Sequence, residues 1–304
     1  MKQHAFNPLR VLGNTPVPWL FPLAAILLLV FLYPVFEIVR LSFTDAKLVG
    51  QTYEYSLQSY LTLLELPGFG AMLWTTALFV FFSALLQMAL GFVIALLVDQ
   101  GTKRKVVGTV VARTAVLSAW AIPGVVIGVI WKMLYSESES GILNYLFHLL
   151  GSDQSVPFLS DPTYALISVT FANVWRGTAF SMILLYAALQ TFPNDLMEAA
   201  KMDGANLWQR LWKVMLPVLS PILMINLIVV TVQTFNTFDM IMALTGGGPG
   251  TSTEVIALSI YNSIFHDFQM GRGAATAVVL LGINILMTVI YFRFIEKGQG
   301  GGRA

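Results

Sequence analysis

The sequence predicts an all-α integral membrane protein with six transmembrane helices, and three observations support this fold class. Hydrophobic residues make up 57% of the 304 residues and charged residues only 11%, which is too little charge to cover a soluble domain of this size. The apolar residues are gathered in runs long enough to cross a bilayer. These runs show no alternation of apolar and polar residues, so helices rather than strands are expected.

The six predicted spans are helical because lipid offers no hydrogen-bond partner to an unpaired backbone amide. The first run has no small-residue cleavage site, so we expect it to be retained as a span rather than removed as a signal peptide. Pro123 in the third run and Pro221 in the fifth are expected to kink their helices. The runs are Val17–Phe43, Ala71–Val98, Val106–Tyr135, Tyr164–Phe192, Pro217–Leu244 and Arg272–Ile295.

The orientation follows from the positions of Lys and Arg, which accumulate in cytoplasmic segments. Eleven such residues lie in the two tails and in the connections between the second and third spans and between the fourth and fifth spans. The loops on the opposite side contain only Lys47. We therefore expect a multi-pass protein of the bacterial inner membrane with both termini and residues 193–216 in the cytosol. The eleven cations are Lys2, Arg10, Lys103, Arg104, Lys105, Lys201, Arg210, Lys213, Arg293, Lys297 and Arg303.

The segments outside the spans give three further expectations. Gly141–Leu150 is predicted to form a short amphipathic helix at the outer membrane interface. The glycine-rich run Gly246–Gly250 is incompatible with helix and should end the fifth span. The chain is expected to divide into an N-terminal part (1–69), a transmembrane core (70–295) and a flexible, disordered tail (296–304).

Composition excludes several functional classes. A net charge of +1 argues against nucleic acid as a partner, and the absence of cysteine excludes thiolate metal sites and thiol nucleophiles. The three histidines, His4, His148 and His266, are far apart in sequence, and no acidic metal motif occurs. We therefore predict no enzyme activity, no catalytic residue, no metal and no cofactor.

The polar segment between the fourth and fifth spans has the pattern of two short helices joined at a glycine. Asp195 is predicted to cap the first helix, with Glu198 completing a capping box. Gly204 is expected to end that helix in the left-handed conformation, and Asn206 to cap the second. Small alanines allow close approach to a partner, but from spacing alone an amphipathic helix on the inner leaflet is an equally good interpretation.

Several short motifs lie in and around this segment. Within it are Glu198-Ala199-Ala200, Asp203-Gly204-Ala205 and Leu216-Pro217; outside it are Asn173-Val174-Trp175-Arg176-Gly177, Ala188-Leu189-Gln190 with Pro193, Leu244-Thr245-Gly246-Gly247-Gly248-Pro249 and Gly271-Arg272-Gly273-Ala274-Ala275. Over residues 17–295 the chain resembles permease subunits of bacterial ATP-binding-cassette (ABC) importers, in the maltose-transporter-like carbohydrate branch.

This resemblance implies a type I importer permease fold. It implies partners: a second homologous permease, two cytosolic ATPase subunits, an extracytoplasmic binding protein and a carbohydrate substrate. Residues 195–215 would form a coupling helix docked on an ATPase, through Glu198, Ala199, Ala200, Asp203 and Gly204. The chain lacks a Gly-x-x-x-x-Gly-Lys-Ser/Thr phosphate loop, so ATP hydrolysis is expected in a separate subunit.

Polar residues inside the fifth span are candidates for a sugar pathway, because buried amides and hydroxyls are costly in lipid. Interhelical hydrogen bonding is the alternative explanation. Alignment with the maltose permease implies eight pathway positions, although Val230 and Gly124 replace residues that carry hydroxyl groups. The eight positions are Trp120, Gly124, Arg176, Gly177, Val230, Gln233, Thr234 and Thr237.

Arg176 lies near the middle of the fourth span and should face water, a carboxylate or substrate. An anionic or phosphorylated ligand is one interpretation, and pairing with a carboxylate of a partner subunit is the one we favour. A permease for a non-sugar solute such as glycerol phosphate is an alternative function. A stand-alone secondary transporter is poorly supported, because it requires paired intramembrane carboxylates or matching interrupted helices.

Overall fold

The computed structural model describes residues 17–50, 52–138, 141–152 and 154–300, so Lys2, Arg10 and Arg303 lie outside the described residues. The described chain is helical, and its β-type pairing is limited to an isolated bridge between Thr44 and Tyr55. The predicted all-α fold class is therefore confirmed.

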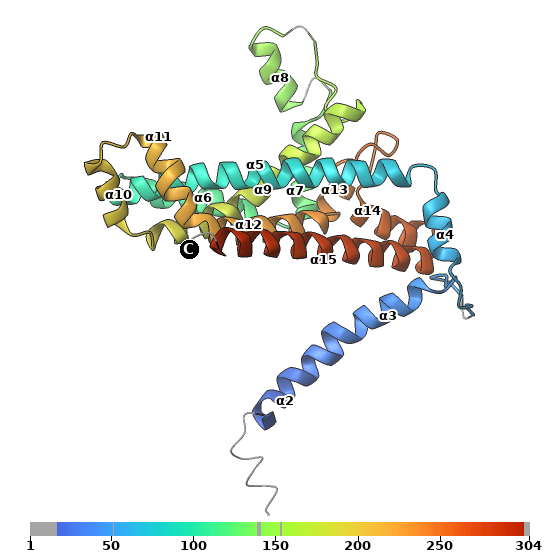
Figure 1. The fold of residues 1–304 in the computed structure, drawn as a ribbon. Coiled ribbons are helices and arrows are strands. Elements are labelled where there is room, and N and C mark those ends of the chain that lie inside the picture. Colours follow the sequence, from blue (N-terminus) through green and yellow to red (C-terminus); the bar gives the residue numbers. More distant parts are fainter. Residues whose placement is uncertain (1–16, 51, 139–140, 153, 301–304) are drawn as a thin grey trace, which may run out of the picture.

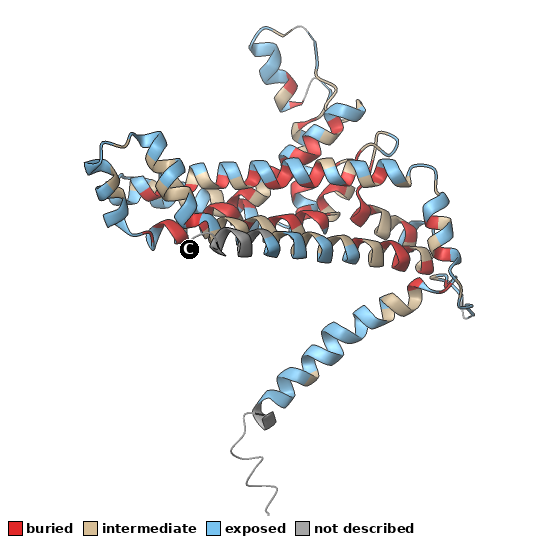
Figure 2. Ribbon diagram, in the orientation of Figure 1, coloured by how far each residue is buried: buried red, intermediate tan, exposed pale blue. Residues whose placement is uncertain are grey.

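The first predicted span forms a continuous helix made of α2 (Val17–Ile26), the π-helical η1 (Leu27–Leu32) and α3 (Tyr33–Ser42). It points away from the other helices (Figure 1), and its most apolar stretch has no buried residue (Figure 2). It joins the body at its C-terminal end, where the Gly271 amide donates to the Ala46 carbonyl at 2.8 Å. An apolar helix exposed along its length requires lipid or another protein around it.

Four long helices run side by side to form the body: α5 (Phe69–Lys103), α9 (Pro162–Gln190), α12 (Leu216–Phe235) and α15 (Met270–Gly300) (Figure 1). The most extensive contact is between α5 and α9. Gly91 permits this contact, because a Cβ there would lie 2.4 Å from the Ser181 Cβ and 2.9 Å from the Met182 amide nitrogen. Glycine thus sets the closest approach of the two central helices.

The number of spans is smaller than six by length and composition. Four unbroken helices of the described chain qualify as spans: Leu20–Ser42, Phe69–Lys103, Leu207–Phe235 and Met270–Arg293. A bent pair, α6 (Thr109–Ala121) and α7 (Gly124–Leu134), raises the number to five. The 29-residue α9 is long enough but less apolar. The prediction of six spans is therefore not confirmed.

Two predicted spans are interrupted. Instead of a kink at Pro123, α6 and α7 are separate helices bent by 105°, and Pro123 precedes the first residue of α7. The fifth predicted run is also divided, because α12 ends at Phe235 and a short helix, α13 (Asp239–Leu244), follows. The break at Pro123 was expected only as a kink, and the polar residues Asn236, Thr237 and Asp239 at the second break were interpreted as part of one continuous span. Pro221 lies inside α12 and does not interrupt it.

Two hydrophobic cores lie at different heights in the body. The first core surrounds Phe79, Ile127, Val169, Met240 and Ile256, from α5, α7, α9, α13 and α14 (Ile256–Tyr261). The second core surrounds Ala95, Met182, Leu185, Ala188 and Leu219, from α5, α9 and α12. Between these cores, α5 and α9 carry polar residues, and this position is where the cavity described below is found.

The remaining helices cap the two ends of the body. At one end are α4 (Gln58–Glu65), α14 and the π-helical η3 (Asn262–His266), and at the other are α10 (Asn194–Met202), α11 (Leu207–Arg210) and the π-helical η2 (Leu211–Met215). The predicted outer helix is present as α8 (Ile142–Leu149), away from the body (Figure 1). The fifth predicted run ends at Leu244, before the glycine-rich run as expected. Helix α15 continues to Gly300, and residues 301–304 lie outside the described part.

A carboxylate outside the membrane-spanning segments fixes the loop that carries α8. Glu137 accepts hydrogen bonds from the Leu159 amide at 2.8 Å, the Ser160 amide at 2.9 Å and the Ser160 hydroxyl at 2.7 Å. Partial burial raises the pKa of Glu137, but these three hydrogen bonds outweigh it and hold the pKa below its ordinary value of 4.5.

A group whose pKa is lowered by folding stabilises the fold above its ordinary pKa and loses this effect as the pH falls through the folded value. We therefore expect protection of the Leu159 and Ser160 amides against hydrogen exchange to fall as the pH drops below 4.5. In Glu137→Gln the protection should be weaker at neutral pH and nearly independent of pH. Glu65→Gln, which changes an exposed carboxylate on α4, is the control. Identical pH profiles in all three proteins would contradict this role.

Candidate functional site

The polar segment between α9 and α12 folds as two helices joined by a left-handed glycine. Gly204 has φ 76°, and the Ala205 and Gly204 amides donate to the Ala200 and Lys201 carbonyls, both at 3.0 Å. Asn206 forms a capping box with Gln209, as the side chain of each accepts from the backbone amide of the other at 2.9 Å. The predicted hinge at Gly204 and cap at Asn206 are confirmed.

The predicted cap at Asp195 is wrong. Helix α10 begins at Asn194 after Pro193, and no side chain caps its start. Pro193 sets the entry angle of the helix and leaves Asp195 inside the first turn, where its charge interacts favourably with the helix dipole instead.

This segment presents an exposed surface at the end of the molecule (Figure 2). Glu198, Ala199, Asp203 and Gly204 are exposed and Ala200 is half-buried. Large apolar side chains are exposed beside them, among which Met202 has 88% and Leu207 78% of its surface accessible. Apolar exposure of this kind marks a contact surface for lipid or protein.

The second helix of the segment continues without interruption into the membrane body. Helix α11, η2 and α12 together form one helix from Leu207 to Phe235, 29 residues long. At 1.5 Å per residue this is a rod of about 43 Å. The fifth span was expected to begin at Pro217, but the helix already begins at Leu207, and the turn before Pro217 adopts the π-helical geometry of η2.

A cavity of about 740 Å³ lies at the far end of this helix, between the two hydrophobic cores. It is lined in part by the residues between α12 and α13 and by Trp120 near the end of α6. Its size falls in the range of small-molecule sites. It is lined by Gln87, Trp120, Asn173, Arg176, Gly177, Val232, Gln233, Thr234, Asn236, Thr237, Phe238 and Asp239.

The structure brings together six of the eight predicted pathway positions in the lining of this cavity: Trp120, Arg176, Gly177, Gln233, Thr234 and Thr237. Trp120 has 53% of its surface exposed, and its ring packs on Phe180 at 6.2 Å between centroids. Thr234 and Thr237 are almost fully buried, and the Thr237 hydroxyl donates to the Gln233 carbonyl at 3.0 Å.

The other two predicted positions do not line the cavity. Val230 is 1% exposed and packs inside the body. Gly124, the first residue of α7, lies against Asp239, the first residue of α13, and a Cβ there would lie 2.0 Å from the Asp239 Oδ2. Gly177 makes similar room, because its Cβ would lie 1.9 Å from the Gln87 Oε1. The two glycines therefore admit polar side chains to the cavity rather than bind a ligand themselves.

Two buried amides in the cavity lining were not predicted. Gln87 is 3% and Asn173 4% exposed. Within the described residues, the Asn173 Nδ2 has no hydrogen-bond partner, and no bond to the Gln87 side-chain amide is found. An unpaired buried amide is costly, and both face a space where a hydroxyl group or water would satisfy them. The available signal was a side-chain amide within each of two predicted membrane spans.

The charged residues of the cavity form a long ion pair within the chain. The Arg176 Nη1 lies 3.9 Å from the Asp239 Oδ1, and the two side chains are 28% and 34% exposed. Arg176 therefore has a carboxylate in its own chain, whereas we had favoured a carboxylate of a partner subunit. With one positive and one negative side chain, the cavity lining has no net charge.

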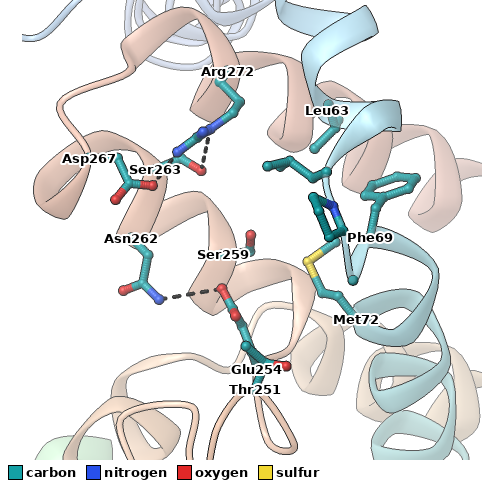
Figure 3. Close-up of a pocket in the computed structure, with 13 residues that line it drawn as sticks. Leu63, Phe69, Met72, Thr251, Glu254, Ser259, Asn262, Ser263, Asp267 and Arg272 are labelled. Atoms are coloured by element: carbon teal, nitrogen blue, oxygen red, sulfur yellow. Dashed lines mark hydrogen bonds and ion pairs between the residues drawn. The ribbon is translucent and has the colours of Figure 1, made fainter.

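A smaller hollow of about 190 Å³ lies at the opposite end from α10, where the turn between α4 and α5 meets α14, η3 and the start of α15 (Figure 3). Its polar groups are engaged with one another: Arg272 binds Asp267 and Ser263, and Asn262 Nδ2 lies 3.5 Å from Glu254 Oε1. None of the predicted site residues lines this hollow.

Comparison with known proteins places these features in context. The family model described as binding-protein-dependent transport system inner membrane component matches residues 87–297. The trehalose/maltose transport system permease protein MalF of Thermococcus litoralis is 32% identical over 90% of this chain and 91% of that protein. The sn-glycerol-3-phosphate transport system permease protein UgpA of Agrobacterium fabrum is 31% identical over 94% of this chain and 97% of that protein.

A similar fold occurs in a solved structure. A chain in the crystal structure of a bacterial alginate ABC transporter, in complex with an alginate pentasaccharide-bound periplasmic protein, superposes with a TM-score of 0.76. The match covers 90% of this chain and 91% of that chain at 19% sequence identity.

The different roles of two glycines on the same helix pair are testable. A Cβ at Gly177 meets the flexible end of Gln87, whereas a Cβ at Gly91 meets the backbone of α9. We expect Gly91→Ala to destabilise the protein by about 1–3 kcal/mol and Gly177→Ala by less than about 1 kcal/mol. Thermal unfolding of both variants in the same detergent measures the difference. Equal losses would show that Gln87 is fixed in place and is not a mobile wall of the cavity.

Proposed function

The chain belongs to the family of inner membrane components of binding-protein-dependent transport systems, and from this premise we propose that it forms half of the import pathway for an uncharged sugar or sugar derivative. It is a membrane-spanning subunit of an ABC importer. In the proposed assembly it pairs with a second permease, rests on two ATPase subunits and receives its cargo from an extracytoplasmic binding protein. Its termini and residues 193–216 are cytosolic.

The observation that carries the cargo proposal is the set of buried amides around the 740 Å³ cavity, beside an exposed tryptophan. Within the described residues the Asn173 Nδ2 has no hydrogen-bond partner, and the side-chain amides of Gln87 and Gln233 line the same space. Sugars present many hydroxyl groups and a flat apolar ring face, so amides and an indole ring supply both kinds of contact. Relatives named for trehalose or maltose transport support this class of cargo.

The charge of the cavity favours a neutral cargo over an anionic one. A relative is named for transport of sn-glycerol 3-phosphate, and Arg176 alone would suit a phosphate group. In this chain, however, Asp239 lies 3.9 Å from the guanidinium and opposes the approach of an anion. Glycerol phosphate is therefore the second candidate cargo.

The segment Asn194–Met215 is proposed to be the contact with an ATPase subunit. Its exposed alanine and glycine residues allow close approach, and Glu198 offers an unpaired carboxylate to a cation on the partner. When the ATPase dimer closes, it draws the coupling segments of the two permeases together. The continuous helix from Leu207 to Phe235 then carries this displacement to the cavity and alternates its access.

The coupling role is tested by reversing the charge of Glu198. Because a charge-assisted hydrogen bond contributes about 1.5–3 kcal/mol, Glu198→Lys should weaken ATPase binding by at least about tenfold and abolish uptake. Co-purification with the ATPase subunit and uptake in cells are the measurements. Glu65→Lys reverses an exposed charge at the opposite end of the molecule and should retain both ATPase association and uptake. Wild-type association in Glu198→Lys would contradict the coupling role.

The preference for neutral cargo is tested at Asp239. Asp239→Asn leaves the Arg176 charge without its carboxylate, so the affinity for sn-glycerol 3-phosphate relative to trehalose should rise by about tenfold, or about 1.4 kcal/mol. Equilibrium binding of both radiolabelled compounds to the purified importer gives this ratio. Asp195→Asn, an exposed carboxylate outside the cavity, is the control. An unchanged ratio in Asp239→Asn would mean that Asp239 does not set the charge preference.

A further inference from the structure

The corner between α5 and α6 carries positive charge that the rest of the chain does not neutralise. Lys103, Arg104 and Lys105 are all exposed there. The Lys103 ammonium lies 2.9 Å from the Asp99 Oδ2, and the Gln190 amide donates to the Asp99 Oδ1 at 2.7 Å. In the described part of the chain, no carboxylate lies within ion-pair distance of Arg104 or Lys105. Two cations at this membrane boundary therefore lack a counter-charge.

An apolar groove of about 530 Å³ begins at this corner and runs between α5 and α6. Its mouth holds Arg104, Gln100 and Thr109. Its walls are aliphatic and include Leu97, with 63% of its surface exposed, and Val106, with 55%. The aliphatic wall residues include Ile94, Leu97, Val98, Val106, Ala112 and Val116.

The length of the groove matches one leaflet of a bilayer. Ile94 on α5 and Arg104, which directly follows the last residue of α5, are ten residues apart, which corresponds to about 15 Å along the helix. The hydrocarbon core of a bilayer is about 30 Å thick, so each leaflet contributes about 15 Å. The cations stand at the end of the groove where lipid headgroups lie, because α5 ends at Lys103 and the chain turns back there.

We propose that this groove is a binding site for an anionic phospholipid. The phosphate group binds Arg104, which lines the groove, and the adjacent exposed Lys105 adds positive charge beside it; one acyl chain occupies the aliphatic groove toward Ile94. Charge complementarity at the mouth and the aliphatic wall of leaflet length both favour a lipid over a soluble anion. A lipid at this position also contacts α5 beside Asp99 and Gln190, so it would stabilise the junction from which α9 leads into the coupling segment.

The test uses the full chain purified in an uncharged detergent. Dioleoyl phosphatidylglycerol, dioleoyl phosphatidylcholine and sodium phosphate are titrated separately, and thermal stability gives an apparent affinity. Native mass spectrometry counts the phosphatidylglycerol molecules retained. We expect wild-type protein to be stabilised by phosphatidylglycerol, far less by phosphatidylcholine, and not by phosphate.

Three variants make the test specific. Since each cation near an anionic membrane surface contributes about 1 kcal/mol, Arg104→Gln with Lys105→Gln should weaken phosphatidylglycerol binding about 30-fold. Lys213→Gln with Arg293→Gln removes the same charge from exposed positions outside the groove and should leave binding unchanged. Ala112→Trp fills the groove and should abolish lipid retention while both cations remain, and its melting temperature in phosphatidylcholine reports whether it folds.

Four outcomes overturn the proposal. If wild type and the Arg104/Lys105 variant bind phosphatidylglycerol with equal affinity, these two cations do not hold the lipid. An equal loss of phosphatidylglycerol binding in the Lys213/Arg293 variant would show that general surface charge, and not this groove, attracts the lipid. Stabilisation by sodium phosphate alone would assign the site to a free anion. Retention of lipid in folded Ala112→Trp would mean that the groove does not hold the acyl chain.

Discussion

Backbone hydrogen bonding in lipid is the constraint on which the functional part of this structure depends. Two helices are interrupted at membrane depth, at 122–123 and at 236–238, and an interruption facing lipid would leave amides and carbonyls unpaired. The interruptions instead meet each other, where Gly124 packs against Asp239. Side chains complete the pairing, since the Asn236 amide donates to the Val232 carbonyl at 2.7 Å and the Thr237 hydroxyl to the Gln233 carbonyl at 3.0 Å. A polar cavity is therefore a consequence of breaking the helices.

The same helices that border the cavity lead directly to the exposed segment Asn194–Met215. Arg176 stands on α9, which ends at Gln190, and Gln233 stands on the rod that begins at Leu207. The segment between them is short and is held by the Gly204 turn. Asp99 ties the end of α9 to the end of α5 through Gln190. Because close-packed helices move as units, a displacement of the segment reaches both walls of the cavity without any flexible connection.

The sequence predicted local features well and tertiary features poorly, for physical reasons. The Gly204 turn and the Asn206 cap depend on a few adjacent residues, and both were found where the pattern predicted them. The separation of α6 from α7 was expected only as a kink at Pro123, and the break after Phe235 was missed, because both breaks are stabilised by contacts between distant helices. Gln87 and Asn173 were missed because only the pairing of α5 with α9 brings them to one cavity. Six of the pathway positions that the resemblance to the maltose permease implied line that cavity, whereas composition and periodicity alone indicated only the polar residues of the fifth span.

A transport cavity must bind its cargo strongly enough to receive it and weakly enough to release it. The lining of this cavity is consistent with that balance. Its only charged groups are an arginine and an aspartate held 3.9 Å apart, so neither presents a full charge to a ligand. Its amides offer neutral hydrogen bonds, which contribute about 0.5–1.5 kcal/mol each and are replaced by water when cargo leaves. Glycine at positions 124 and 177 leaves room for the Asp239 and Gln87 side chains. In the proposed importer such a surface would discriminate weakly among sugars of similar size, which would leave strong selection to the binding protein that delivers the cargo.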